Sequence, residues 1–382
     1  MKQKLYLLGS YVLVAALAVA VTLGAVGFTQ RQESSKLDDL ESLIGECFVG
    51  EADLTKLEDA AANAMIQATG DRWSYYIPAS SYETHMEQVK NAFVGVGITI
   101  QQAEEGFLVV GVNPDGPGQE AGILAGDILI TVSDQDVREM TMDEVRNLVR
   151  GEEGSNVSMT LLREGQELTL SVQRRRIQTE VAKGQLLENG VGLVTIANFD
   201  ERCADETIAA IEGLLAQGAE KLIFDVRNNP GGYASEMVEV LDYLLPEGDL
   251  FRTVRYDGKE QVDRSNEKCL ELPMAVLVNG DSYSAAEFFA AALSEYEAAV
   301  VVGEKTCGKG YFQNTYRFDD GSAVALSVGK YYTPKGVSLA EVGITPDVPV
   351  EVDEDTAKAI RYGSLPWQED PQIQAAMEAL SA

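Results

Sequence analysis

Residues 222–232 read LIFDVRNNPGG, an apolar run that leads directly into a proline and two glycines. The apolar run is typical of a buried β-strand, and the two glycines allow backbone conformations that bring N–H groups close to a ligand. A tight turn between a strand and a helix is the simpler interpretation of the same glycines. The flanking patterns predict a strand at 190–199 and a helix at 205–216. This alternation predicts a βαβ arrangement.

A second strand–turn–helix unit lies further along the chain. Residues 274–278 read MAVLV, a buried strand, and residues 284–291 read SAAEFFAA, a helix. Ser284 therefore falls at a strand-to-helix turn, where helix N–H donors can stabilise a developing oxyanion. A serine at this position is also a common helix N-cap, so the pattern alone leaves both roles open.

A serine nucleophile needs a base, and the chain contains one histidine, His85, in a polar stretch without a partner nucleophile. Lys309 lies between two glycines after the strand predicted at 298–303. Burial lowers the pKa of a lysine from about 10.4 toward the ~7–8 useful for proton transfer. Gln313, four residues further on, could hold the neutral amine by a hydrogen bond. The alternative for Lys309 is a surface lysine in a loop.

A compact module precedes this region, from about residue 93 to 175. It contains predicted strands at 106–112 and 127–132, a helix at 141–149, and a hairpin whose apolar residues alternate on both sides of Glu164-Gly165. The three arginines at 174–176 are most simply a solvated linker.

The module resembles a PDZ domain through Gly95-Val96-Gly97-Ile98, the segment GQEAGI at 118–123 and the segment GDIL at 126–129. The resemblance implies that Gly95, Val96, Gly97, Ile98 and Thr99 bind the C-terminus of a peptide, which adds a strand beside the helix. A phosphate-binding loop is the alternative, but it needs a glycine-rich turn that opens a helix, and residues 98–100 read as a strand.

Residues 5–28 form a run of 24 residues without a charged side chain, long enough to cross the roughly 30 Å hydrocarbon layer as a helix. Lys2 and Lys4 precede it, which places the N-terminus in the cytoplasm and the rest of the chain outside. A cleaved signal peptide is the alternative, and both interpretations export the catalytic part. Residues 36–67 then predict two short amphipathic helices.

The composition excludes several classes of protein. The 382 residues are 45% hydrophobic and carry a net charge of −31, which fits about two or three folded domains and argues against a nucleic-acid partner. A single histidine excludes a zinc site that needs a histidine pair. The cysteines, Cys47, Cys203, Cys269 and Cys307, are scattered without a CxxC pair, and their spacing assigns no disulfide.

Four motifs in this order resemble the carboxyl-terminal processing peptidases, also called tail-specific serine proteases with a PDZ domain: DVRNNPGG at 225–232, SAAE at 284–287, GEKTCGKG at 303–310 and GITPD at 343–347. The resemblance implies an α+β multidomain fold with an N-terminal transmembrane helix, a helical segment, a PDZ domain and a ClpP/crotonase-like αβ serine protease domain. The expected ranges are a cytoplasmic tip and membrane anchor at 1–35, a helical region at 36–92, the PDZ domain at 93–175, the protease domain at 176–350 and a C-terminal helical tail at 351–382.

The same resemblance implies roles at the site. Ser284 would be the nucleophile, Lys309 the general base and Gln313 the residue that positions it, while Gly231 or Gly232 and the N–H of Ala285 would form the oxyanion hole. No metal or cofactor is implied.

The resemblance also implies a setting and partners. The substrates would be protein or peptide C-termini, and the protein would be a single-pass protein of the bacterial cell membrane with its catalytic part extracytoplasmic. The helical segments at 36–67 and 372–380 could form a homodimer. A catalytically silent PDZ adaptor and a crotonase-type acyl-CoA enzyme are the alternatives.

Overall fold

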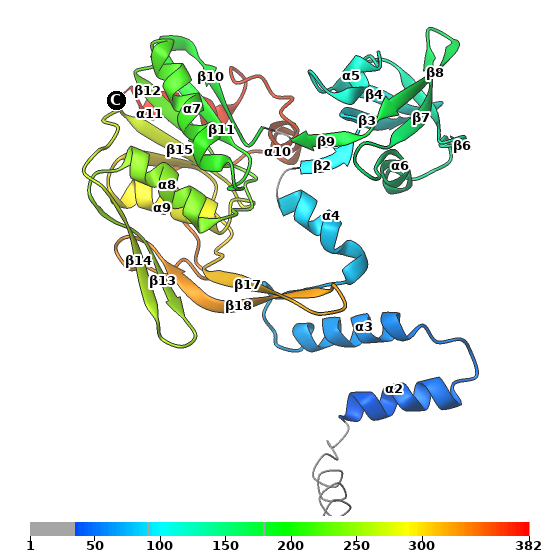
Figure 1. Ribbon diagram of the computed structural model, residues 1–382. Helices are drawn as coiled ribbons and strands as arrows, with labels where there is room; N and C mark the ends of the chain where they lie inside the picture. Colours follow the sequence, from blue (N-terminus) through cyan, green and yellow to red (C-terminus); the bar gives the residue numbers. More distant parts are fainter. Residues whose placement is uncertain (1–34, 90–91, 179, 382) are drawn as a thin grey trace, which may run out of the picture. The chain divides into compact units, whose positions relative to one another are not determined.

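The computed structural model describes residues 35–89, 92–178 and 180–381 (Figure 1). The chain forms two compact units, one up to Arg72 and the other from Trp73 on. The predicted membrane anchor at 5–28 lies outside the described residues. Among the helices that are described, none has the length and apolar character needed to cross a bilayer.

The first unit contains the two expected amphipathic helices, α2 (Lys36–Cys47) and α3 (Leu54–Gln67). Each begins at a side-chain cap, because Ser35 accepts the N–H of Asp38 and Asp53 accepts the N–H of Lys56. Both helices expose large apolar side chains: Leu37, Leu40, Leu43, Leu54 and Met65.

The second unit opens with β1 (Tyr75–Ile77) and α4 (Ala79–Val89) and continues into a small β-rich region. Its elements are β2 (Ala92–Gly95), β3 (Ile98–Ala103), β4 (Gly106–Val112), α5 (Pro117–Glu120), β5 (Ile128–Val132), β6 (Gln135–Asp136), α6 (Met142–Val149), β7 (Asn156–Arg163), β8 (Gln166–Gln173) and β9 (Arg175–Gln178). One sheet has the order β3-β4-β5-β7-β8, and β2 pairs separately with β9. The predicted hairpin is present as β7 and β8, with Leu161 opposite Leu168.

The arginine run that was predicted to be a solvated linker is ordered instead. The guanidinium of Arg174 donates to the carbonyl oxygens of Leu148 and Val149 at 2.9 and 2.8 Å. The last carbonyls of a helix have no partner within the helix, and here Arg174 supplies donors to the end of α6. Arg175 then begins β9, so the linker prediction was wrong.

The remaining elements form the larger part of the second unit: β10 (Ala182–Leu186), the 3₁₀ turn η1 (Glu188–Gly190), β11 (Val191–Ile196), α7 (Cys203–Ala216), β12 (Lys221–Asp225), α8 (Ala234–Leu244), β13 (Gly248–Arg255), β14 (Glu260–Ser265), β15 (Met274–Val278), α9 (Ala285–Glu295), β16 (Ala299–Gly303), β17 (Tyr311–Arg317), β18 (Ala323–Tyr332), β19 (Val348–Pro349), α10 (Glu354–Arg361) and α11 (Pro371–Ala379).

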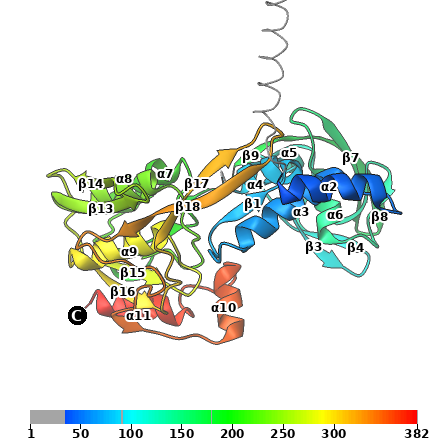
Figure 2. The ribbon, with the colours of Figure 1, turned by 90° about the horizontal axis from the view of Figure 1, so that it is seen from below.

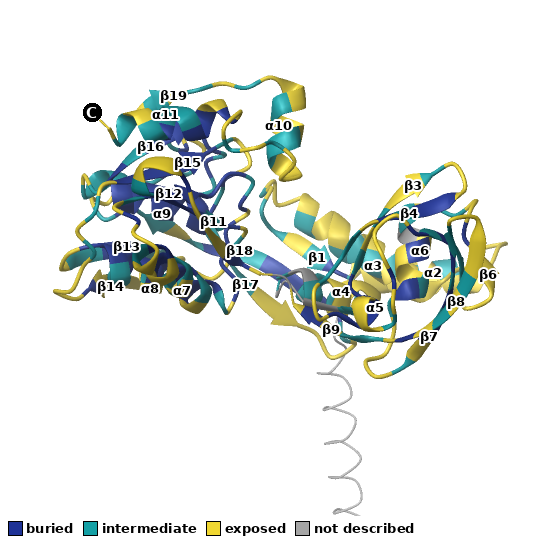
Figure 3. Cartoon of the chain, turned by 90° about the horizontal axis from the view of Figure 1, so that it is seen from above, coloured by how far each residue is buried: buried dark blue, intermediate teal, exposed yellow. Residues whose placement is uncertain are grey.

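The main sheet has the order β10-β11-β12-β15-β16-β19, and its strands from β11 to β19 are parallel. Helices α7, α8 and α9 pack on one face and α11 on the other, as Figure 2 shows. The central strands β12 and β15 are therefore buried on both faces (Figure 3), as expected for apolar parallel strands. This confirms the predicted βαβ arrangement.

The parallel sheet fixes the place of the candidate site. Strands β12, β15 and β16 run side by side in the same direction, so the loops that follow them leave from one edge. These are the loops at 228–232, 279–284 and 304–310. A second sheet, in the order β1-β18-β13-β14 with β17 paired to β18, carries Gln313.

Candidate active site

Ser284 is the residue before α9 and has backbone angles φ 58° and ψ −127°. This region is rarely occupied by residues other than glycine and costs on the order of 1–3 kcal/mol. Its side chain is largely buried, with 7% of the residue exposed. The position of Ser284 is compatible with both roles that the sequence left open, nucleophile and helix N-cap, because it lies at the strand-to-helix turn and directly before α9.

Gly231 approaches Ser284 more closely than any other residue type could. A Cβ atom built on Gly231 would lie 2.7 Å from the Cβ of Ser284 and 2.9 Å from the nitrogen of Ala285, and its φ is +89°. The candidate nucleophile, the first helical N–H and the glycine loop are thus brought together. The N–H of Gly231 itself donates to Oδ1 of Asn229 at 2.8 Å, so this structure engages that donor inside the loop.

Hydrogen bonds join the glycine loop to the serine turn. The N–H of Asn228 donates to Oδ1 of Asn279 at 2.9 Å, and the amide of Asn279 donates back to Oδ1 of Asn228 at 3.1 Å. The hydroxyl of Ser282 donates to the carbonyl of Val226 at 2.7 Å. Because these bonds cross between two strands, each loop fixes the position of the other.

A buried ion pair, in which Arg227 binds Asp225 and Asp370, lies next to the glycine loop. The guanidinium of Arg227 binds both carboxylate oxygens of Asp225 at 2.9 and 2.6 Å and the carboxylate of Asp370 at 2.9 Å. Burial opposes the charge of Arg227, but the two carboxylates outweigh it and raise its pKa above the ordinary value. Asp370 also caps α11, so the C-terminal helix is tied to the strand that leads into the loop.

Glu287 holds the serine turn and the lysine loop together, a role that the sequence did not reveal. Its carboxylate is fully buried and accepts the N–H of Ser284 at 3.1 Å, the N–H of Gly308 at 2.7 Å and the N–H of Lys309 at 2.8 Å. It also accepts the hydroxyl proton of Thr306 at 2.5 Å. An acid three residues after a helix N-cap is usually explained as part of a capping box. The sequence alone therefore offered no reason to expect that Glu287 also binds the lysine loop.

Lys309 is half-buried, and its ammonium faces two aromatic rings. Its Nζ lies 4.9 Å from the ring centre of Trp73 and 5.7 Å from that of Tyr283. Burial raises the pKa of Tyr283, with a smaller contribution from Cys307 and Tyr75 nearby.

Gln313 lies on β17 at a register shift against β18. Its amide nitrogen donates to the carbonyl of Tyr311 at 3.2 Å and to the hydroxyl of Ser327 at 3.0 Å. The backbone N–H of Ser327 in turn donates to the hydroxyl of Ser74 at 2.9 Å. The side chain that is expected to position the lysine is therefore itself held in place from β18.

The predicted peptide-binding residues line a groove of about 290 Å³. Gly95, Val96, Gly97, Ile98 and Thr99 form one side, and residues of α6 together with Arg150 form the other: Met142, Arg146, Val149 and Arg150. A groove between the edge of β3 and α6 has the shape that an added strand requires.

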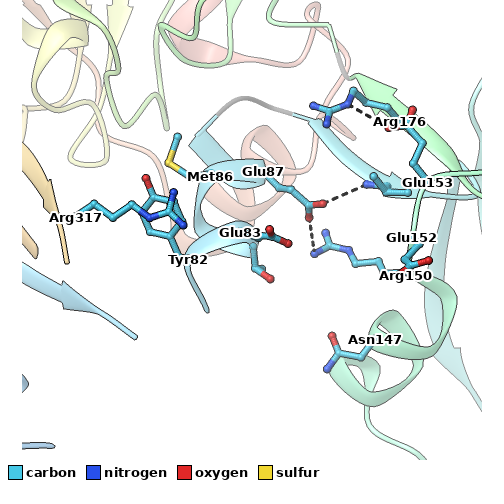
Figure 4. A pocket seen from close by; sticks show the side chains of 13 residues that line it. Tyr82, Glu83, Met86, Glu87, Asn147, Arg150, Glu152, Glu153, Arg176 and Arg317 are labelled. Carbon is cyan, nitrogen blue, oxygen red and sulfur yellow. Dashed lines mark hydrogen bonds and ion pairs between the residues drawn. The ribbon is translucent and has the colours of Figure 1, made fainter. Parts of the chain in front are cut away.

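Arg150 also lines a larger, neighbouring cavity of about 860 Å³, shown in Figure 4. Its guanidinium lies 3.5 Å from Oε2 of Glu87 on α4, and Oε1 of Glu87 accepts the N–H of Val94 at 3.4 Å. At the other end of α4, the Arg317 guanidinium stacks on Tyr82 at 4.7 Å. His85, on the same helix, packs edge-on against Tyr75, with 3.4 Å between Nε2 and the tyrosine hydroxyl.

Two sequence profiles match the chain. Residues 108–163 match the PDZ domain, and residues 190–350 match Peptidase family S41. The strained serine, the glycine loop and the parallel sheet all lie within the second match. The fold and the site thus define a serine-type peptidase joined to a PDZ domain.

Known proteins narrow this class to a family. The carboxy-terminal processing protease CtpA of Bacillus subtilis strain 168 is 32% identical over 96% of this chain and 80% of its own length. The chain belongs to the carboxy-terminal processing proteases of peptidase family S41. The resemblance inferred from the four motifs is thereby confirmed.

A solved structure has the same fold. A Bacteroides fragilis NCTC 9343 protein assigned to the S41 proteases covers 90% of this chain and 96% of its own, with 16% identity and a TM-score of 0.56. A photosystem II D1 C-terminal processing protease is 26% identical over 83% of this chain and 87% of its own, with a TM-score of 0.49.

Proposed function

We propose that the protein is an endopeptidase that recognises protein C-termini through its PDZ domain and cuts the chain nearby with a Ser284–Lys309 dyad. The single observation that carries the dyad is the carboxylate of Glu287, which accepts the backbone N–H groups of both residues. One buried group thus sets the relative position of the nucleophile's turn and the base's loop.

The reaction uses four proton transfers at one amine. Neutral Lys309 takes the proton of the Ser284 hydroxyl as the oxygen attacks the scissile carbonyl carbon, and the carbonyl oxygen becomes an oxyanion. When the tetrahedral intermediate collapses, the peptide C–N bond breaks and the leaving amine takes the proton from Lys309. Water then attacks the acyl ester and gives a proton to Lys309. The bond between the acyl carbon and Ser284 Oγ breaks, Lys309 returns that proton to Oγ, and the second product leaves.

The oxyanion would be held by backbone N–H donors at the start of α9 and in the glycine loop. The N–H of Ala285 belongs to the first turn of α9, whose donors have no partner within the helix. Gly231 lies beside this position, since a Cβ built on it would come within 2.9 Å of the nitrogen of Ala285, and its own N–H is engaged by Asn229. Gly232 is therefore the more suitable donor of the two glycines, and Gln313 would hold the neutral amine of Lys309.

The groove beside α6 supports recognition of a peptide C-terminus. Arg146 and Arg150 line it and supply positive charge near the Gly95–Thr99 segment, which favours a carboxylate ligand.

The domain ranges given in the sequence analysis are kept as proposals. Residues 1–35 would hold the chain to the bacterial cell membrane, with its catalytic part outside the cytoplasm. Two chains would pair through the helical segments at 36–67 and 372–380.

The test uses the purified full chain and a peptide substrate that ends in a free carboxylate. We expect cleavage by the unaltered protein and none by Ser284→Ala or Lys309→Ala, while Lys305→Ala retains activity because that neighbouring lysine is exposed. Amidation of the peptide's C-terminus should raise KM. Full activity in Lys309→Ala would refute the dyad, and equal kcat/KM for the amidated peptide would refute recognition of the C-terminus.

A silent PDZ adaptor is not favoured, because Ser284, Lys309 and Gln313 are all present. Membrane attachment is tested separately by fractionating cells that express the full chain or residues 36–382. The proposal expects the full chain in the membrane fraction after alkaline extraction and the shortened chain in the supernatant. Recovery of the full chain in the supernatant would contradict an anchor.

A further inference from the structure

Two aromatic rings from distant parts of the sequence meet at the amine of Lys309. Trp73 comes from the segment before β1, and Tyr283 from the turn before α9. Their ring centres are 6.0 Å apart and the rings are inclined by 34°. Both centres lie within about 6 Å of Nζ of Lys309, the range in which an ammonium is attracted to an aromatic face.

Trp73 is held at this place by the residues that follow it. The hydroxyl of Ser74 accepts the N–H of Ser327 at 2.9 Å, and Tyr75 pairs with Ala325 in the adjacent strand. The hydroxyl of Ser327 accepts the amide of Gln313 at 3.0 Å. The segment that carries Trp73 and the strand that carries Gln313 therefore share one hydrogen-bonded anchor.

An aromatic face distinguishes between the two protonation states of an amine. The ring quadrupole attracts an ammonium, and attracts it most strongly for tryptophan, while a neutral amine gains little. A general base must be neutral when it accepts a proton. The ring faces of Trp73 and Tyr283 thus favour the form of Lys309 that cannot act as a base.

We propose that Trp73 is a positioning residue that, with Tyr283, holds the amine of Lys309 as an ammonium in the resting enzyme. When the side chain leaves the ring faces, the ammonium gives its proton to solvent water, and the neutral amine that results turns toward Ser284 as the base. The role rests on the proposed function of Lys309 as general base. It also makes the segment after Arg72 part of the environment that sets the enzyme's pH range.

Other titratable groups lie around the lysine loop, and each can change the relative stability of the ammonium and the neutral amine of Lys309. They include Glu287 on α9, Tyr283 before α9, Tyr75 on β1, Cys307 on the loop itself and Glu341, whose N–H donates to the carbonyl of Gly308. All of these groups are present both in a variant of Trp73 and in the parent, so the comparison changes only the ring at position 73.

The test reads the protonation of Lys309 directly. The full chain carrying Ser284→Ala is labelled with acetic anhydride from about pH 6 to about pH 11, a range that includes the ordinary lysine pKa of about 10.4. Acetylation of Lys309 is quantified by mass spectrometry at each pH. We expect Trp73→Leu to shift the labelling midpoint down by about one pH unit and Trp73→Phe to shift it less, because phenylalanine keeps a weaker ring face. Tyr256→Leu is the matched control, since Tyr256 stacks on Arg255 and is exposed. Its midpoint should equal that of the parent.

An unchanged midpoint in Trp73→Leu, or a shift equal to that of Tyr256→Leu, would overturn the proposal. If Trp73→Leu fails to fold, as judged by circular dichroism, Trp73→Phe and Tyr283→Leu carry the test with the same criterion. In protein with Ser284 intact, the acid limb of kcat/KM should move by the same amount with KM unchanged. Activity in Lys309→Ala would refute the base while leaving the labelling shift intact, so the two failures are distinguishable.

Discussion

Glu287 accepts the backbone N–H of Lys309 at 2.8 Å through the same carboxylate oxygen that accepts the N–H of Ser284 at 3.1 Å. A buried carboxylate is costly unless hydrogen-bond donors surround it, and here four donors do so. The charge is thus stabilised only when the serine turn and the lysine loop are both in place.

Replacement of Glu287 by glutamine should therefore lower kcat more than it changes KM. The amide keeps the volume, but its NH₂ group faces N–H donors, and the loop must shift to avoid an unpaired contact. We expect kcat to fall by about 100-fold, the size of effect that a displacement of about 1 Å produces, and the free energy of unfolding by about 1–3 kcal/mol.

Glu206→Gln is the matched control for this variant. Glu206 also accepts backbone N–H groups, those of Val181 and Ala182, but it lies on α7. Steady-state kinetics should show kcat unchanged in Glu206→Gln. Equal kcat losses in the two variants would assign the effect of Glu287 to general stability.

Gly231→Ala should lower kcat strongly, because the new Cβ would collide with the backbone nitrogen of Ala285 and the Cβ of Ser284. Displacement of the N–H donors at an oxyanion site costs about 10²–10³ in kcat. Gly218→Ala is the control that separates the effect of a steric collision from that of backbone strain. Gly218 also has a positive φ, +94°, but a Cβ added there would have no atom within 4 Å. Assays of both variants should find full activity in Gly218→Ala, and an unchanged kcat in Gly231→Ala would contradict the oxyanion assignment.

The strained backbone of Ser284 predicts a stability order that differs from that of an ordinary helix position. Ser284→Gly removes the strain of a positive φ, so it should have a higher free energy of unfolding in urea than Ser284→Ala. The expected difference is about 1 kcal/mol, after allowance for the larger backbone entropy that glycine has in the unfolded chain. At Ser294, inside α9, glycine should be the less stable variant by about 0.5–1 kcal/mol. The same order at both positions would show that Ser284 carries no net strain.

A buried carboxylate in the PDZ region, that of Asp127, is paired with a partly exposed arginine and gives stability a pH dependence. Arg163 donates to both carboxylate oxygens of Asp127 at 2.7 and 2.8 Å, and this bond outweighs burial and lowers the pKa of Asp127. A lowered folded-state pKa contributes stability above the unfolded value of about 3.9, and that stability is lost as pH falls through the folded value.

Asp127→Asn should therefore be less stable than the parent at pH 7, by about 1–3 kcal/mol, and the difference should shrink toward pH 3. Asp136→Asn is the control, because the Asp136–Arg138 pair is exposed and should change stability little at either pH. Urea unfolding at both values checks this. A difference for Asp127→Asn that is independent of pH would contradict the linkage.

Local patterns predicted the elements that bear the site. Alternation at 157–172 predicted the hairpin β7–β8, and the apolar run at 274–278 predicted the strand that ends at Ser284. These predictions succeeded because side-chain period and turn residues act within a few positions.

Long-range contacts were beyond such patterns. Trp73 is far from Lys309 in sequence, and no periodicity marks a tryptophan that will stack on a distant amine. Arg174 was predicted to be solvated because three adjacent arginines carry no signal of the helix end that one of them caps. Glu287 was visible in the motif but not in its burial, which depends on how the loop after β16 folds over α9.

The hydrogen bond between Ser74 and Ser327 spans 253 positions of the chain. A ribosome that has made Trp73, Ser284 and Lys309 has not yet made the strand that fixes Gln313 and the edge on which β1 pairs. Folding that needs such distant pairing comes late. A chain made only as far as Lys309 thus has the proposed base but lacks β18, the strand that anchors both Gln313 and the segment that carries Trp73.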